Sequence, residues 1–259
     1  MSIVIVIPAR LHSTRLPEKL LRRVGGKSIL QHTYDQARRA NSADRVIVAV
    51  DDESLMREVI RFGGQAEMTS PTCASGTDRV AEIATRIDAE ILVNVQGDEP
   101  EIDPAAIDLV AQALAADPMA DIATLATPIR STHMLKDPGC VKIAMRDAPG
   151  DATGVGQAIY FSRSVIPHPR GGVTDPQLNQ EPPLFWHHIG LYAYRRQFLR
   201  WFANQPPSSL EQTESLEQLR AVEAGKRIVV CRTESAASGI DTEADLTAFA
   251  GRYSAGQNS

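Results

Sequence analysis

Positively charged side chains cluster directly after the first apolar run of this 259-residue chain. The run covers Ile3–Ile7, and Arg10, Arg15 and Lys19 follow it closely. Residues 10–27 hold six Arg or Lys and one Glu, so this segment carries a charge of +5 in a chain whose formal net charge is −5. Guanidinium and ammonium groups bind phosphate oxygens well. The segment therefore predicts a site for one small anionic ligand, against the alternative of a solvated basic loop.

The place of these cations in the expected fold supports a ligand site. The β-branched run before them is typical of a strand that is buried on both faces. We expect this strand to end at Pro8, because proline has no N–H to donate to a sheet ladder. Ligands of open α/β sheets bind just beyond the carboxyl ends of the strands. Arg10, Arg15 and Lys19 are expected to lie there.

Two acidic residues lie next to other predicted elements. Asp98 follows the apolar run at 90–95 and is separated from it by Gly97, and Asp241 precedes the last predicted helix. Mg²⁺ is usually held by one or two carboxylates together with phosphate oxygens and water. Both residues are therefore candidate Mg²⁺ ligands. The alternatives are a turn residue at Asp98 and a helix cap at Asp241, and spacing alone favours the cap for Asp241.

A third candidate site is the segment Ser75–Arg79, with the sequence Ser-Gly-Thr-Asp-Arg, at the start of a predicted helix. Free backbone N–H groups at a helix start bind a phosphate or a nucleobase carbonyl. Small residues there let a flat base approach the backbone. An ordinary capped helix start explains the same residues equally well.

Several common site patterns are absent from the sequence. No GxGxxG follows the first strand, and neither GxxxxGK[ST] nor GxSxG occurs. These absences argue against a dinucleotide Rossmann site, a P-loop and a hydrolase elbow. The pair His187-His188 suggests a metal site, but adjacent residues on a strand point to opposite faces, so at most one of them faces a ligand.

Apolar and helical periodicities alternate along the first half of the chain. The predicted strands there are 3–7, 45–50, 66–69, 90–95 and 121–127, and the predicted helices are 28–40, 54–62, 78–87 and one from Asp103. Later strands are 141–145, 157–161, 189–194 and 227–231, an exposed excursion covers 168–183, and later helices are 197–203, 210–223 and one from Asp241 that frays from Ser254. This order predicts an α/β, Rossmann-like, doubly wound and mostly parallel sheet. We assign residues 1–127 and 194–259 to this core and 128–193 to a smaller lobe.

The composition is that of an ordinary globular protein, with 43% hydrophobic and 23% charged residues. No apolar run approaches the length of a membrane span, and we expect no signal peptide, no membrane insertion and a cytoplasmic location. The acidic net charge argues against nucleic-acid binding. Three scattered cysteines form no CxxC pair and predict neither a disulfide nor a zinc framework.

Seven motifs occur in a fixed order along the chain. They are Ile7–Arg10 with Ser13–Lys19, Ser75–Arg79, Asn94–Pro100, Tyr160–Arg163, His188–Tyr192, Leu210–Glu211 with Leu216–Arg220, and Gly239–Thr242. Together they resemble the 3-deoxy-manno-octulosonate (Kdo) cytidylyltransferase family, the CMP-Kdo synthetases of lipopolysaccharide assembly, over nearly the whole chain. The resemblance implies a fold of the nucleotide-diphospho-sugar transferase type, a dimerisation role for the smaller lobe, and a homodimer.

The resemblance also implies a reaction in which the anomeric hydroxyl of Kdo attacks the α-phosphorus of CTP, with Mg²⁺ as cofactor and CMP-Kdo and pyrophosphate as products. It implies catalytic roles for Arg10, Arg15, Lys19 and Asp98, and metal binding by Asp98 and Asp241. The implied nucleotide contacts are Ala9, Arg10, Ser13, Arg15, Lys19, Ser75, Gly76, Arg79 and Gln96. The implied sugar contacts are Gln96, Arg163, His188, Tyr192, Glu211 and Gln218, of which Arg163 suits the sugar carboxylate.

Three positions depart from the family pattern. Glu18 stands where glycine is usual, and we expect it to face solvent because a carboxylate turned inward would repel a phosphate. Ala74 replaces a frequent glutamine, and Asp137–Cys140 replaces an Asn-Pro-Asn loop. None of these departures removes a residue that we assign to the chemistry.

Two kinds of alternative function remain. The first is a related acceptor, either 8-amino-Kdo or a sialic acid, and the Ser13–Pro17 run favours Kdo over a sialic acid. The second is a catalytically silent nucleotide-binding regulator, which would be expected to lose Lys19 or Asp98. Both residues are present.

Overall fold

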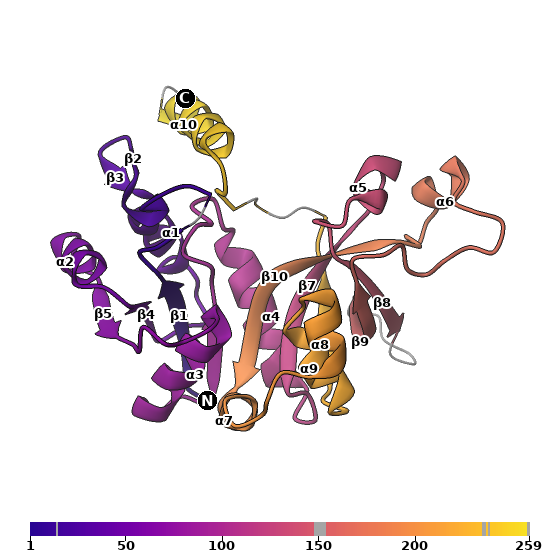
Figure 1. The fold of residues 1–259 in the computed structure, drawn as a ribbon, viewed down its shortest axis with the longest axis horizontal. Coiled ribbons are helices and arrows are strands. Elements are labelled where there is room, and N and C mark those ends of the chain that lie inside the picture. The colour runs from indigo at the N-terminus through magenta and orange to yellow at the C-terminus, as the bar shows by residue number, and fades with distance from the viewer. Residues whose placement is uncertain (14, 148–153, 235–236, 238, 258–259) are drawn as a thin grey trace. The chain divides into compact units, whose positions relative to one another are not determined.

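The computed structural model describes residues 1–13, 15–147, 154–234, 237 and 239–257 (Figure 1). Thr14, which belongs to the basic segment, lies outside the described residues. The chain divides into two compact units, Met1–Asp108 with Ala237–Ser259, and Leu109–Ala236. The predicted boundaries at 127/128 and 193/194 differ from these. They fall inside the strands Ile122–Pro128 and Trp186–Arg195, which pair with one another within the second unit.

The first unit contains a parallel sheet, a short hairpin and the helices that connect them. Its elements are β1 (Ile3–Ala9), the 3₁₀ helix η1 (Lys19–Leu21), β2 (Arg23–Val24), β3 (Lys27–Ser28), α1 (Ile29–Ala37), β4 (Arg45–Val50), α2 (Glu53–Arg61), β5 (Gln65–Met68), α3 (Gly76–Arg86), β6 (Ile91–Asn94) and α10 (Glu243–Gln257). The boundary between the units at Asp108 falls inside α4 (Pro104–Ala116).

The second unit contains a mixed sheet and short helices. Its elements after α4 are β7 (Ile122–Pro128), α5 (Thr132–Lys136), β8 (Lys142–Asp147), β9 (Val155–Ser162), α6 (Asp175–Asn179), β10 (Trp186–Arg195), α7 (Arg196–Phe202), α8 (Ser209–Glu214), α9 (Gln218–Glu223) and β11 (Ile228–Arg232).

The sheet of the first unit has the strand order β5-β4-β1-β6, and its three pairs are all parallel. The chain runs from β1 outward to β4 and β5, and it then returns to β6 on the other side of β1. Because such crossovers are almost always right-handed, α1 and α2 belong to one face of the sheet and α3 to the other. The predicted α/β class is confirmed, and the strand order reverses between β1 and β6. Open sheets of this kind bind ligands at that point of reversal.

Pro8 does not end the first strand, which corrects the prediction. All seven residues of β1 are buried, and Pro8 and Ala9 stay in register with Ala49 and Val50 of β4. The pairing of β1 with β6 ends earlier, at Val6 opposite Asn94. Proline removes only one backbone donor, so the strand continues for as long as β4 supports it.

The strands of the second unit are not mostly parallel, which is a second correction. Their order is β10-β7-β11-β9-β8, and among the described residues of this unit β7 and β11 are the parallel pair in it. β8 pairs with β9, β9 with β11, and β10 with β7, each in antiparallel fashion. The parallel arrangement of the first unit therefore does not extend through the second.

Two predicted helices have different bounds in the structure. The predicted helix 210–223 is divided into α8 and α9, because Ser215 adopts the left-handed conformation with φ of 52°. α10 continues past Ser254 to Gln257, so the expected fraying from Ser254 was wrong. Within the described ranges, no helix has the length and apolar character that crossing a membrane requires.

The close approach of β1 to the turn after β6 gives a testable prediction. A Cβ at Gly97 would lie 3.1 Å from the carbonyl oxygen of Pro8. A backbone atom inside a sheet cannot move away freely, so Gly97→Ala should lower the free energy of unfolding by about 1–3 kcal/mol. Urea unfolding measures this change.

Gly251 is the matched control, because it lies inside α10 and a Cβ there meets open space. Gly251→Ala should raise the free energy of unfolding by about 0.5–1 kcal/mol. Equal effects of the two substitutions would show that the approach of Gly97 to Pro8 is not a tight contact.

Candidate active site

Four charged side chains from three segments meet in the first unit. Lys19 Nζ lies 2.5 Å from Asp98 Oδ2 and 3.0 Å from Asp241 Oδ1. Arg15 Nη2 lies 3.0 Å from the same oxygen of Asp241. Lys19 is buried, whereas the side chain of Arg15 is 67% exposed. The structure thus places two predicted cations against the two predicted metal ligands.

Hydrogen bonds to two backbone carbonyls hold the turn after β6 and the segment before α10 in place. Gly97 follows β6, and its carbonyl accepts a hydrogen bond of 3.0 Å from Thr33 Oγ1 of α1. The carbonyl of Asp98 accepts a hydrogen bond of 2.9 Å from the N–H of Ile240. The segment before α10 is therefore attached directly to the turn after β6, which allows one cation to bridge Asp98 and Asp241.

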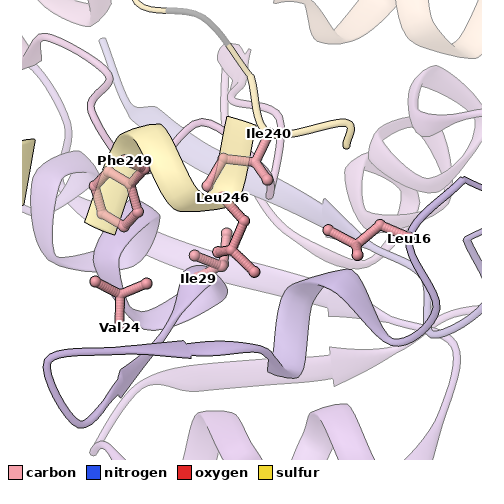
Figure 2. Close-up of a cluster of buried hydrophobic side chains, with 6 residues drawn as sticks. All are labelled: Leu16, Val24, Ile29, Ile240, Leu246 and Phe249. Carbon is pink, nitrogen blue, oxygen red and sulfur yellow. The ribbon is translucent and has the colours of Figure 1, made fainter. Parts of the chain in front are cut away.

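An apolar cluster joins α10 to the basic segment. Figure 2 shows its members: Leu16, Val24, Ile29, Ile240, Leu246 and Phe249. Leu16 directly follows Arg15, and Ile240 directly precedes Asp241, so the buried neighbours of two charged residues pack in one cluster. Burying an apolar side chain of this size contributes about 1.5–3 kcal/mol. The cluster can therefore stabilise a charged site in which Lys19 and Asp241 lie 222 residues apart in sequence.

Asp241 precedes α10 but does not cap it. Thr242 Oγ1 accepts a hydrogen bond of 3.2 Å from the N–H of Asp245, and Asp245 Oδ2 accepts one of 2.8 Å from the N–H of Thr242. These two residues cap the helix reciprocally. The carboxylate of Asp241 faces Lys19 and Arg15 instead. The cap alternative for Asp241 is therefore wrong.

The predicted third motif forms the capped start of α3. Ser75 Oγ accepts a hydrogen bond of 3.2 Å from the N–H of Asp78, whose carboxylate accepts one of 3.1 Å from the N–H of Ser75. Gly76 packs against the end of β1, because a Cβ there would lie 3.3 Å from the ring of Pro8 and 3.7 Å from Gln96 Oε1. Two predicted nucleotide contacts, Gly76 and Gln96, thus lie together beside β1.

Arg79 forms a buried ion pair with a residue that the sequence analysis did not single out. Its Nη2 donates to Asp51 Oδ2 at 2.8 Å, and its Nη1 donates to Thr69 Oγ1 at 2.8 Å. Asp51 Oδ1 accepts a hydrogen bond of 2.9 Å from the N–H of Leu11. Asp51 therefore ties the start of the basic segment to α3. Its position directly after β4 was the available signal, since that is the ligand-binding edge of the sheet.

The other members of the basic segment differ in exposure. Ala9 ends β1 and is buried, Arg10 is exposed, and Ser13 is partly buried. Glu18 is exposed, as expected, and has a left-handed backbone with φ of 49°. Glycine adopts that conformation without steric cost, so a glycine would fit the same turn.

Glu99 adds little charge to the site although it adjoins Asp98. Burial, together with the charge of Asp98, raises the pKa of Glu99 to about 8. Its carboxyl group is therefore mainly protonated at neutral pH. The charges at this site are therefore those of Asp98 and Asp241 and of the two cations that face them, Lys19 and Arg15.

Two predicted sugar contacts of the second unit lie against each other on β10. The rings of His188 and Tyr192 are 5.4 Å apart, and an irregularity of β10 between Ile189 and Tyr192 shifts its register against β7. His188 Nε2 lies 3.0 Å from Thr124 Oγ1. Burial, and to a lesser degree His187, lowers the pKa of His188 to about 3. His188 is therefore a neutral hydrogen-bonding group and not a cation for a sugar carboxylate.

Other predicted sugar contacts already bind protein groups. Arg163 donates to the carbonyl oxygens of Glu214 at 2.7 Å, Pro138 at 2.9 Å and Ser215 at 3.1 Å. These bonds use three of its five N–H donors. The carboxylate contact predicted for Arg163 would depend on the remaining two.

Glu211 and Gln218 lie on the helices α8 and α9. Both Glu211 oxygens accept hydrogen bonds from Arg220, at 2.5 and 2.6 Å. Burial opposes ionisation of Glu211, but these bonds and one from Ser208 hold its pKa below the usual value. Gln218 is buried at the start of α9. The ion pair of Glu211 therefore gives this residue a clear structural role beside its predicted sugar contact.

Known proteins match nearly the whole chain. A family model described as cytidylyltransferase matches residues 4–228. A protein of Rhodopirellula baltica named 3-deoxy-manno-octulosonate cytidylyltransferase is 58% identical over 253 residues, which cover 97% of this chain and 98% of that protein. The chain belongs to the 3-deoxy-manno-octulosonate cytidylyltransferase family. The resemblance inferred from the seven motifs is confirmed.

Further members of the family agree. A protein of Syntrophotalea carbinolica with the same name is 45% identical over 95% of this chain and 96% of its own length. The solved structure of a CMP:2-keto-3-deoxy-manno-octonic acid synthetase complexed with CTP matches with a TM-score of 0.87 and 38% identity, over 98% of this chain and 99% of that one. The nucleotidyltransferase-type α/β fold is therefore shared over 98% of this chain.

The contacts of Asp51 with Arg79 and Leu11 predict that this residue contributes to the stability of the fold. Asp51→Ala leaves the buried guanidinium of Arg79 uncompensated, so the free energy of unfolding should fall by about 3–5 kcal/mol. The N–H of Leu11 should also lose its protection in native-state hydrogen exchange, because its acceptor is gone.

The neighbouring Asp52 is the matched control, since its carboxylate caps α2 by accepting a hydrogen bond from Ser54. Asp52→Ala should cost only about 1 kcal/mol and should leave the exchange of Leu11 unchanged. An unaltered Leu11 exchange rate in Asp51→Ala would contradict the role assigned to Asp51.

Proposed function

We propose that the chain transfers a cytidylyl group from CTP to the anomeric hydroxyl of Kdo, which forms CMP-Kdo and pyrophosphate for lipopolysaccharide biosynthesis. The observation that carries this proposal is the pair of carboxylates, Asp98 and Asp241, that faces Lys19 and Arg15. Transfer at a phosphorus atom requires little covalent chemistry from the protein and relies on positioning and charge neutralisation. Carboxylates that bind a metal ion and cations that bind phosphates supply both the positioning and the charge neutralisation.

Mg²⁺ is the cofactor of this proposal, and Asp98 and Asp241 are its protein ligands. Their oxygens already share one cation, and hard oxygen donors suit Mg²⁺. The described part of the chain holds no cluster of three or more His, Cys, Asp or Glu suited to a metal. Phosphate oxygens and water would complete the shell, as is usual for Mg²⁺. The ion would neutralise phosphate charge and lower the pKa of the attacking hydroxyl.

The first unit is the proposed CTP-binding part. Arg10, Arg15 and Lys19 would bind the triphosphate and stabilise the charge of the leaving pyrophosphate. Gly76 and Gln96 lie beside Pro8 at the end of β1, where small and polar groups suit the edge of a cytosine ring. Ala9, Ser13, Ser75 and Arg79 complete the proposed nucleotide contacts.

The second unit is the proposed sugar-binding part. His188 and Tyr192 offer neutral hydrogen-bonding groups for sugar hydroxyls, and the remaining N–H donors of Arg163 suit the carboxylate. Glu211 and Gln218 are the further proposed sugar contacts of this unit. We further propose a homodimer with a dimerisation lobe at residues 128–193, which family membership alone supports. A cytoplasmic location completes the proposal.

The reaction is tested by measuring pyrophosphate release from CTP with Kdo, 8-amino-Kdo and N-acetylneuraminate in parallel, with and without EDTA. We expect release with Kdo that EDTA abolishes. Stronger release with either of the other acceptors would change the assigned substrate, and release that persists in EDTA would contradict the metal assignment.

The site is tested with Asp98→Asn, which keeps the size of the side chain and removes its charge. Turnover should fall at least about 100-fold, equivalent to about 2.7 kcal/mol of transition-state stabilisation. Asp35→Asn is the control, because Asp35 forms an ion pair with Lys27 away from the four charged residues. Equal turnover of the two variants at saturating Mg²⁺ would exclude Asp98 from the chemistry.

A further inference from the structure

We propose that Lys19 occupies the cation position between Asp98 and Asp241 in the nucleotide-free protein, and that the triphosphate draws this lysine away, so that the divalent ion binds only together with the nucleotide. This inference rests on the proposed function. It goes further because it fixes the order in which metal and nucleotide can enter.

The ammonium group of Lys19 contacts the same two carboxylates that we assign to the metal ion. Its ammonium lies 2.5 Å from Asp98 Oδ2 and 3.0 Å from Asp241 Oδ1. It therefore uses one oxygen of each carboxylate that we assign to the metal. Mg²⁺ binds its ligand oxygens at about 2.0–2.1 Å. An ammonium and a divalent ion on the same oxygens would repel each other strongly, so their occupancies exclude each other.

The local charges point to an exchange of partners. Asp98 and Asp241 carry two negative charges, and Lys19 and Arg15 balance them. A divalent ion that arrives alone meets two carboxylates that are already neutralised. A triphosphate offers new anionic oxygens to both cations, and their departure leaves the carboxylates for the metal. After this exchange the divalent ion balances the two carboxylates, and the two cations balance two charges of the triphosphate.

The local structure allows the ammonium to move while the backbone stays in place. Lys19 is the first residue of η1, and the N–H groups of Leu21 and Arg22 donate to the carbonyls of Glu18 and Lys19. Leu20 is buried beside it. The lysine stem is long and flexible, so its charged end can change partner without unfolding this turn.

The test is the binding of Mn²⁺ to the nucleotide-free protein, followed by the electron paramagnetic resonance signal of the free ion. Lys19→Met keeps an unbranched side chain that is one atom shorter, and it removes the charge. It should bind Mn²⁺ at least about tenfold more tightly than the wild-type protein. Adding Asp98→Asn to this variant should abolish the gain, which would locate the ion at the two carboxylates.

Lys226→Met is the matched control, because Lys226 forms an ion pair with Asp121 in the second unit and its loss changes the net charge equally. Its Mn²⁺ affinity should equal that of the wild-type protein. An unchanged or weaker Mn²⁺ affinity of Lys19→Met would overturn the proposal, and so would an equal gain in Lys226→Met.

A measurement on the wild-type protein keeps the proposal testable if Lys19→Met does not fold. The non-cleavable nucleotide α,β-methylene-CTP should raise Mn²⁺ binding to the protein at least about tenfold above its nucleotide-free level. Equal Mn²⁺ affinity with and without this nucleotide would overturn the exchange. Pyrophosphate release from CTP and Kdo, measured on the same preparation, separates the two claims, because its absence would contradict the proposed function itself.

Discussion

One buried ammonium group holds the candidate site together. Lys19 contacts Asp98, which lies 79 residues later in the chain, and Asp241, which lies 222 residues later. Two carboxylates that contact the same ammonium group would repel each other if that cation were absent. The apolar cluster around Leu16 and Ile240 brings the backbone segments together, but it does not orient charged groups. The ion pairs of Lys19 do so in this structure, where both carboxylates face one shared cation position.

The parallel sheet of the first unit explains why these segments meet. Strand order reverses between β1 and β6, and the turns after both strands lie at the same edge. Gly97 permits the turn after β6 to approach Pro8, and Thr33 fixes that turn through its carbonyl. At the same edge, Asp51 after β4 holds Leu11 and Arg79. The sheet therefore places the turns after β1, β4 and β6 beside one another, and the bond of Ile240 to Asp98 adds Asp241 to them.

The sequence predicted the parts of the site that depend on local pattern and missed those that depend on tertiary contacts. Lys19 and Asp98 follow buried strands, so their place at the sheet edge could be inferred. The role of Asp241 was ambiguous, because the sequence before a helix does not distinguish a capping carboxylate from one that binds a ligand. The hydrogen bonds between Thr242 and Asp245 show that these residues cap α10. The role of Asp51 was not predicted, because one of its partners is the backbone N–H of Leu11, and every residue except proline has such a group.

The fold shows the same division. Alternating strands and helices predicted the parallel sheet of the first unit, but strand direction in the second unit depends on connections that periodicity does not reveal. The exchange of Lys19 for a metal ion between Asp98 and Asp241 is tested most directly by a crystal structure with Mn²⁺ and α,β-methylene-CTP. It should show anomalous density touching Asp98 and Asp241, with Lys19 Nζ on phosphate oxygens. Density held by other residues, or a Lys19 that still bridges both carboxylates beside the bound nucleotide, would contradict it.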